Sequence, residues 1–178
     1  FYSNVGAGKV TIYDEAKPKT LENIQDTLLF TSGQTIKKYS GLEPRFSFSF
    51  QLTTGTAIKG GYSRSYQYLN LLSNTSSASP TDLWQLSNYN ITPQSANSFS
   101  LGYFNKRENK NYEFYVSGFY KNIQQSIDYR DFAKVLLNKN IETDLVRGLG
   151  KAFGIESFYS IKKEKSTIEV NYTYTREI

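Results

Sequence analysis

Six segments of this chain alternate between apolar and polar side chains, and this alternation constrains the fold more than any other feature. The clearest case is 43–54, where Phe46, Phe48 and Phe50 are separated by single serines. Because successive side chains of an extended strand point to opposite faces, such a segment forms a strand with one apolar and one polar face. The pattern predicts strands at residues 43–53, 56–68, 96–106, 111–124, 150–162 and 166–177, and a seventh within 1–13.

The connections between these segments alternate in length. Short links rich in Gly, Asn and charged residues lie at 54–55, 107–110 and 163–165, and they are typical of hairpin turns. Long excursions separate the hairpins at 14–42, 69–95 and 125–149, with short helical turns expected near 20–24 and 131–137. Excursions of this length are uncommon in compact soluble domains and are usually functional.

Two all-β architectures fit this pattern. Antiparallel up-and-down strands with short turns at one end and long loops at the other are typical of a large outer-membrane β-barrel with short periplasmic turns and long extracellular loops. The alternative is a soluble extracellular β-sandwich that binds carbohydrate or protein, with the Phe-rich face in its core. That alternative predicts shorter loops and a buried Phe face.

The composition argues against several functional classes. The 178 residues include no Cys and no His, which removes the thiolate metal ligands and the usual neutral-pH general base. An enzyme is therefore not expected, nor is a cofactor or a metal. The formal net charge is +5, but the basic residues are spread along the chain and concentrate in turns, so a nucleic-acid partner is not expected.

Several motifs resemble the barrel strands of TonB-dependent outer-membrane receptors. They are residues 39–45 (YSGLEPR) before an alternating strand, 62–69 (YSRSYQYL), 91–94 (ITPQ) leading into 101–103 (LGY), and 150–156 (GKAFGIE). Their order and spacing also fit that family, and together they cover residues 39 to about 174.

The resemblance implies a 22-stranded barrel that imports a scarce nutrient through the outer membrane of a Gram-negative bacterium. Residues 1–178 would be part of that barrel, and we expect the chain to be a piece of a longer polypeptide. The N-terminal plug, the segment that contacts TonB and the remaining strands would lie outside it. The implied partners are outer-membrane lipid, TonB, the surface lipoprotein that some members of the family have, and a siderophore, oligosaccharide or peptide as the ligand.

Candidate functional residues fall into two groups. In the long loops, Trp84, Gln85, Tyr89 and Arg130 could capture ligand by stacking and hydrogen bonding, although Trp84 could equally anchor its loop on the rim. The polar strand face would line the barrel lumen, and its candidate residues are Ser47, Ser49, Gln51, Lys59, Ser63, Glu113, Glu169 and Asn171.

A further loop cluster holds Asp128, Arg130, Asp131 and Asp144. Its carboxylates could act as acid and base or bind Ca²⁺, but their spacing matches no recognised calcium loop. A solvated loop surface is the default expectation for this cluster.

Overall fold

The structure is a computed structural model that describes residues 2–14, 17–72, 82–107, 111–133, 138 and 140–178. It is built from antiparallel β-sheets, with two short 3₁₀ turns among the described residues. The chain divides into two compact units. We call them the sheet unit (42–65, 96–124 and 149–178) and the loop unit (1–41, 66–95 and 125–148).

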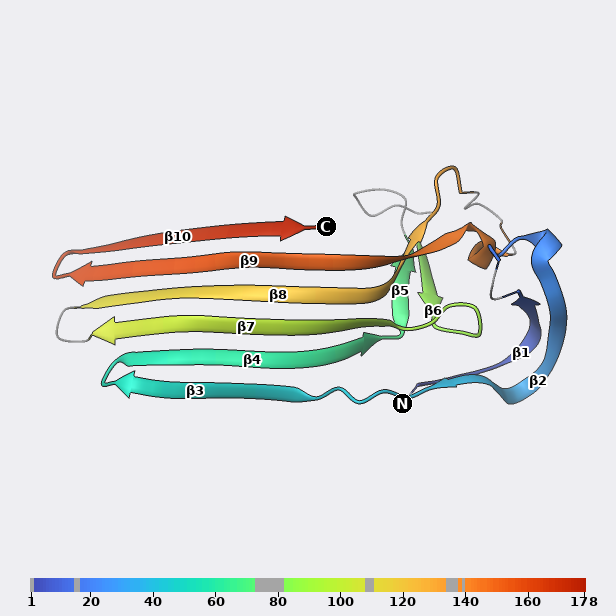
Figure 1. The fold of residues 1–178 in the computed structure, drawn as a ribbon, viewed down its shortest axis with the longest axis horizontal. Coiled ribbons are helices and arrows are strands. Elements are labelled where there is room, and N and C mark those ends of the chain that lie inside the picture. The colour runs from blue at the N-terminus through green and yellow to red at the C-terminus, as the bar shows by residue number, and fades with distance from the viewer. Residues whose placement is uncertain (1, 15–16, 73–81, 108–110, 134–137, 139) are drawn as a thin grey trace. The chain divides into compact units, whose positions relative to one another are not determined.

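The sheet unit carries a six-stranded antiparallel sheet in the order β10-β9-β8-β7-β4-β3 (Figure 1). Apart from the two excursions, strands adjacent in sequence are adjacent in space, which is an up-and-down meander. The strands are β3 (Arg45–Thr53), β4 (Thr56–Gln67), β7 (Gln94–Arg107), β8 (Tyr112–Tyr129), β9 (Leu145–Lys163) and β10 (Ser166–Glu177).

All six strands predicted from the alternation are therefore confirmed. The largest differences are that β8 ends at Tyr129 and β9 begins at Leu145, so both are longer than expected at the ends next to the last excursion. The tight link between β3 and β4 depends on Gly55, whose φ of 94° lies in the left-handed region that favours glycine.

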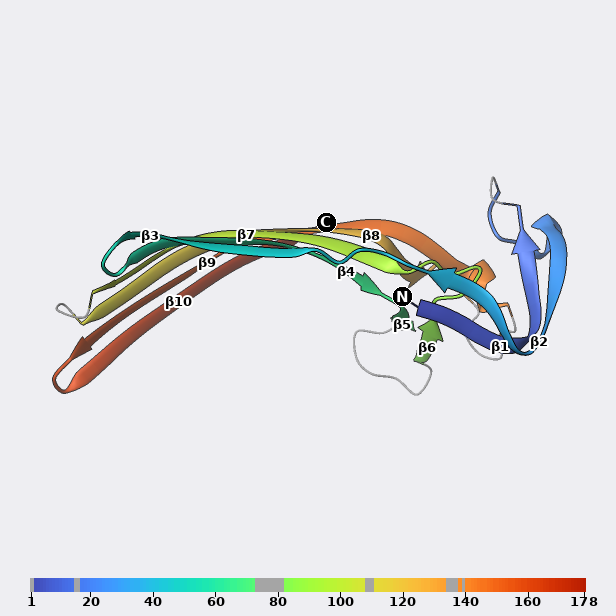
Figure 2. The same cartoon turned by 90° about the horizontal axis from the view of Figure 1, so that it is seen from below.

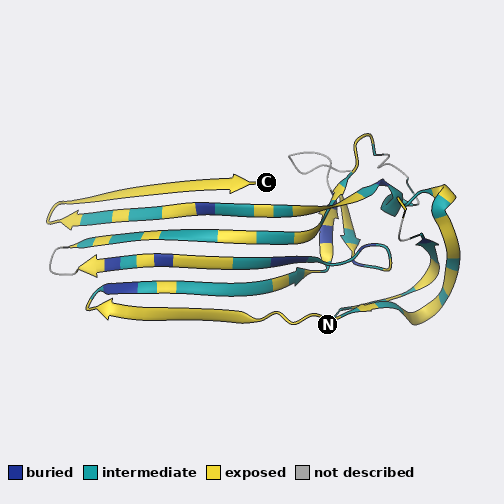
Figure 3. Cartoon of the chain, in the orientation of Figure 1, coloured by how far each residue is buried: buried dark blue, intermediate teal, exposed yellow. Residues whose placement is uncertain are grey.

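The sheet is one layer thick (Figure 2). Both edge strands are solvent-exposed along their whole length (Figure 3), because β3 and β10 each have a neighbour on one side only. The Phe side chains of β3 remain exposed, at 64% for Phe46 and 63% for Phe50. Within this unit no second layer of described residues covers them, unlike the buried Phe face that a β-sandwich requires.

Two aromatic rings in this sheet lie over glycines on the neighbouring strand. A Cβ added to Gly60 would lie 2.6 Å from the Phe48 ring, and one added to Gly154 would lie 2.8 Å from the Phe119 ring. The missing side chain leaves room for the ring, which in turn covers the bare backbone.

The loop unit contains two smaller sheets. β1 (Tyr2–Tyr13) pairs with β2 (Ile24–Tyr39), and β5 (Leu69–Leu72) pairs with β6 (Leu83–Leu86). The short 3₁₀ segments are η1 (Leu21–Asn23) and η3 (Ile141–Asp144). The described buried apolar residues of this unit are Tyr13, Leu72 and Ile91.

These sheets correct two expectations. The strand predicted within 1–13 exists, but it pairs with β2 and is not a member of the six-stranded sheet. The excursions 14–42 and 69–95 are not simple loops, since they contain strands of their own. The helical turn expected near 20–24 is present as η1, while the one expected at 131–137 falls mostly outside the described residues.

Candidate functional site

The eight residues proposed to line a lumen all lie on one face of the six-stranded sheet, which we call the polar face. Directly paired residues of antiparallel strands share a face, and the register pairs Ser49 with Lys59 and Arg45 with Ser63. The same rule places Glu169 opposite Ser160 on β9. The eight residues are Ser47, Ser49, Gln51, Lys59, Ser63, Glu113, Glu169 and Asn171.

A row of aromatic rings crosses this polar face. Phe104 of β7 stacks on Tyr115 of β8, which stacks on Phe158 of β9, with both pairs of ring centroids 5.4 Å apart. At the β4 end of the row, the Lys59 ammonium lies 4.7 Å from the centre of the Phe104 ring, within the range of a cation–π contact. The polar face therefore carries one apolar strip with a cation at its end.

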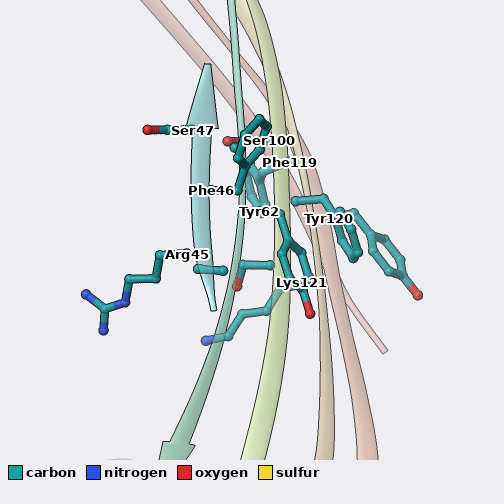
Figure 4. Close-up of a pocket in the computed structure, with 12 residues that line it drawn as sticks. Arg45, Phe46, Ser47, Tyr62, Ser100, Phe119, Tyr120 and Lys121 are labelled. Carbon is teal, nitrogen blue, oxygen red and sulfur yellow. The ribbon is translucent and has the colours of Figure 1, made fainter. Parts of the chain in front are cut away.

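A shallow hollow of about 390 Å³ lies on the polar face, at a place where several small side chains are neighbours (Figure 4). Its lining includes Ser47, Gly61 and Ser100, with the cations of Arg45 and Lys121 beside them. In Figure 4 these two cations and Ser47 extend to one side of the strands, whereas Tyr120 extends to the other. The alternation of side chains thus separates a basic, hydroxyl-rich surface from an aromatic one.

The opposite face, which we call the apolar face, is continuous across the sheet. The Tyr62 ring lies 4.8 Å from that of Phe99, and its hydroxyl donates a 2.9 Å hydrogen bond to Oδ1 of Asn97. Its exposed large side chains include Phe46, Phe50, Leu101, Ile155, Ile168, Val170 and Tyr172. Such an apolar surface is unusual in water and marks a site of contact with another molecule or a membrane.

The loop unit contains a cleft of about 550 Å³ that is built around the turn 88–91. The side chain of Asn88 accepts hydrogen bonds from the backbone N–H groups of Asn90 and Ile91, at 2.9 and 3.0 Å. The Asn90 amide donates to the Thr11 carbonyl at 3.0 Å, and the Tyr39 hydroxyl donates to the Asn88 carbonyl at 2.7 Å. The turn is therefore fixed to both strands of the β1–β2 hairpin.

The fixed turn presents the backbone carbonyl oxygen of Asn90 to two cations. Nζ of Lys19 donates to this oxygen, and so does Nη2 of Arg147 at 2.9 Å. Burial, reinforced by the positive charge of Arg147, lowers the pKa of Lys19 to about 8, against a smaller opposing effect of Glu142. A neutral carbonyl thus holds two cations close together without cancelling either charge.

Two tyrosine rings and a third cation complete the wall of this cleft. Lys37 lies 4.9 Å from the centre of the Tyr89 ring and 6.0 Å from that of Tyr39. Burial raises the pKa of Tyr39, and burial together with the charge of Glu142 raises the pKa of Tyr13 to about 12, so both phenols stay neutral at physiological pH.

A second cleft of about 440 Å³ in the same unit shares Lys17, Lys19, Asn90 and Arg147 with the first. Arg130 also lines it, and its guanidinium lies 2.5 Å from the carboxylate of Asp144. That carboxylate is buried and also accepts a 2.7 Å hydrogen bond from Asn138. The default expectation of a solvated loop surface is therefore wrong for Asp144.

The structure separates the four residues expected to capture ligand. Tyr89 lines the first cleft and Arg130 the second, but Trp84 and Gln85 line neither. Trp84 is 62% exposed on β6, where it pairs with Leu71, and the side chain of Gln85 donates to the Leu86 carbonyl. Reasoning from the sequence missed Lys19, Lys37 and Arg147; the basic segments 17–19 (KPK) and 37–38 (KK) were signals for the two lysines, and Arg147 had none.

The part of the chain that the structure describes contains no group of three or more acidic side chains placed to hold a metal ion. No helix among the described residues is long and apolar enough to cross a membrane. Comparison with protein-family models and with curated protein sequences found no match to this chain. The functional interpretation therefore depends on the geometry of the two units.

Proposed function

We propose that this chain is a sector of an outer-membrane β-barrel of the TonB-dependent receptor type, in which the sheet unit spans the membrane and the loop unit captures a nutrient at the cell surface. The observation that carries the proposal is the six-stranded meander with one apolar face, one polar face and two exposed edges. In a barrel, the apolar face contacts lipid and the polar face contacts the water-filled lumen.

The exposed edges support this proposal. Every residue of β3 and β10 is exposed, and among the described residues each of these strands has a paired strand on one side only. In lipid each unpaired backbone group is costly, so a membrane-spanning sheet must close on itself. We infer that both edges continue into further strands of the same receptor.

The connectivity agrees with a barrel that has a short-turn end and a long-loop end. Links of two residues join β3 to β4 and β9 to β10, and a short link joins β7 to β8. The connections from β4 to β7 and from β8 to β9 contain the β5–β6 hairpin and η3. Long structured connections on one side only are the arrangement found in nutrient receptors and porins.

The β-sandwich alternative receives no comparable support. It requires a second sheet on the Phe side of the strands, whereas Phe46, Phe50 and Leu101 are each more than half exposed.

Adjacent residues of the central strand β7 offer a direct test. Residues 1–178 contain no cysteine, so Phe99→Cys, Ser100→Cys and Leu101→Cys can each be introduced as the single thiol of the complete receptor, with any cysteine outside these residues replaced by serine. After reconstitution in liposomes, Ser100→Cys should react with a charged, water-soluble maleimide. A fluorophore attached in detergent to Phe99→Cys or Leu101→Cys should instead be quenched by brominated lipids after reconstitution.

The two flanking residues serve as mutual controls, since both belong to the apolar face. Equal maleimide reactivity at all three positions would contradict the proposal. So would the absence of lipid quenching at residues 99 and 101, since a soluble sandwich protects these side chains with protein and not with lipid.

A further inference from the structure

We propose that the cleft around Asn90 binds an oxyanion, as the carboxylate or phosphate of a ligand with a ring-sized body. Lys19 and Arg147 would hold the oxyanion, and the Tyr39 and Tyr89 rings would contact the body. The inference deepens the proposed capture role of the loop unit and rests on it for its biological setting.

The first observation is the excess of positive charge in the cleft. Its described lining contains four cations, Lys17, Lys19, Lys37 and Arg147, and one carboxylate, Asp14. Asp14 lies 3.3 Å from Lys17. None of the other three cations has a carboxylate within ion-pair distance among the described residues.

The second observation is the convergence of two cations on one oxygen. Lys19 and Arg147 approach the Asn90 carbonyl from different segments, so their charged groups lie close together and repel each other. The lowered pKa of Lys19 reflects the burial and this repulsion. A negatively charged ligand would offset the desolvation cost and the repulsion, because charge-assisted hydrogen bonds to carboxylate or phosphate are stronger than bonds to a neutral carbonyl.

The third observation concerns the size of the cleft and the other groups that line it. A volume of about 550 Å³ falls in the range of small-molecule pockets. The Tyr39 and Tyr89 rings provide flat surfaces in the cleft, and Lys37 lies 4.9 Å from the centre of the Tyr89 ring. This combination suits a sugar acid or a sugar phosphate better than an apolar ligand, since it offers ring contacts and polar groups together.

The test is binding of three related probes to the detergent-solubilised protein, measured by calorimetry: glucuronate, glucose 6-phosphate and glucose. The first two should bind saturably and more weakly as salt is added, while glucose, which has the same ring without the charge, should bind at least about tenfold more weakly. Inorganic phosphate should compete with both charged probes.

Variants locate the site. Lys19→Gln and Arg147→Gln should each weaken binding of the charged probes about tenfold or more, because each removes a charged hydrogen-bond donor. Lys38→Gln is the matched control, because Lys38 is an exposed lysine of the same unit that lines neither cleft, and it should change affinity less than about threefold. Equal binding of glucose and glucuronate, or unchanged affinity in both variants, would overturn the inference.

An anionic lipid headgroup is the other possible source of the same chemistry. If glucose 6-phosphate and glucuronate fail to bind, but vesicles containing phosphatidylglycerol bind and Lys19→Gln abolishes that binding, the ring-bodied ligand is wrong and the cleft holds lipid phosphate. These measurements need no membrane insertion, so they can fail while the thiol-labelling test of the barrel succeeds, and the reverse.

Discussion

A single added methyl group at Gly154 should destabilise the sheet unit. The glycine lies on β9, where a Cβ would be 2.3 Å from the carbonyl oxygen of Tyr174 on β10 and 2.8 Å from the Phe119 ring. Real Cβ atoms essentially never approach closer than 3.0 Å. In Gly154→Ala the Tyr174 carbonyl must therefore move away by at least 0.7 Å, from 2.3 to 3.0 Å.

This displacement sets the size of the effect. Stretching interstrand hydrogen bonds of about 2.9 Å by that amount takes them beyond hydrogen-bond length. The loss of one or two such bonds, at about 1 kcal/mol each, adds to about 1–3 kcal/mol for forcing the Phe119 ring from its place. We expect Gly154→Ala to lower the free energy of unfolding by about 2–5 kcal/mol.

The assay is urea unfolding in one fixed detergent, followed by the far-ultraviolet circular dichroism of the strands. Gly148→Ala is the matched control, since Gly148 lies on the same strand and an added Cβ there meets no atom within 4 Å. The control should be neutral or slightly stabilising. Equal midpoints for the two variants would refute the close approach of β10 to β9 at Gly154.

Two further predictions concern the loop unit, which contains the chain's one tryptophan, Trp84, as a fluorescent reporter of unfolding. Arg130→Ala should lower the unfolding free energy by about 1–3 kcal/mol, because the buried Asp144 carboxylate would then keep, among the described residues, only its bond from Asn138. No loss relative to wild type would contradict this role of the ion pair. The pKa of Lys19 is lowered to about 8 from its ordinary value of 10.5, so the unfolded chain binds more protons between these pH values and stability should rise from pH 7.5 to 9.5. In Lys19→Met, the stability followed by Trp84 fluorescence should no longer rise over this pH range. An equal rise in the variant would assign the effect to another group. The raised pKa values of Tyr13 and Tyr39 affect stability only above about pH 10, where unfolded tyrosines ionise.

The six-stranded sheet could be predicted from the sequence because its strands keep a strict two-residue period. β3 alternates Phe with Ser, and β10 pairs with β9 through twelve consecutive residues without a register shift. A two-residue period is a local signal, so it can be recognised in one strand without knowing which strand pairs with it. Short turns such as 54–55 then determine which strands form hairpins.

The β1–β2 hairpin was harder to predict for a physical reason. Its register shifts at three places, between Asn4 and Val5, Gly6 and Gly8, and Ile12 and Tyr13. Each shift moves later side chains to the opposite face, so the two-residue period is lost even though the strands are long. The four-residue strands β5 and β6 are too short for any period to emerge.

The candidate cleft could not be predicted from sequence patterns, because the residues that line it come from distant segments. Lys19, Asn90 and Arg147 belong to three separate stretches of the loop unit, and no spacing along the chain relates them. Tyr89 was expected to contact ligand and does line the cleft, whereas Trp84, the most conspicuous aromatic residue, does not.

The oxygen that gathers Lys19 and Arg147 belongs to the main chain of residue 90 and not to its side chain. Any amino acid at this position supplies the same oxygen, provided that the turn keeps its shape. Proteins built on this plan could therefore change residue 90 as they diverge and still hold the two cations together, provided that another contact replaces the hydrogen bond from the Asn90 side chain to Thr11. The backbone conformation would then keep Lys19 and Arg147 in place, while the surrounding side chains could change to suit different ligands.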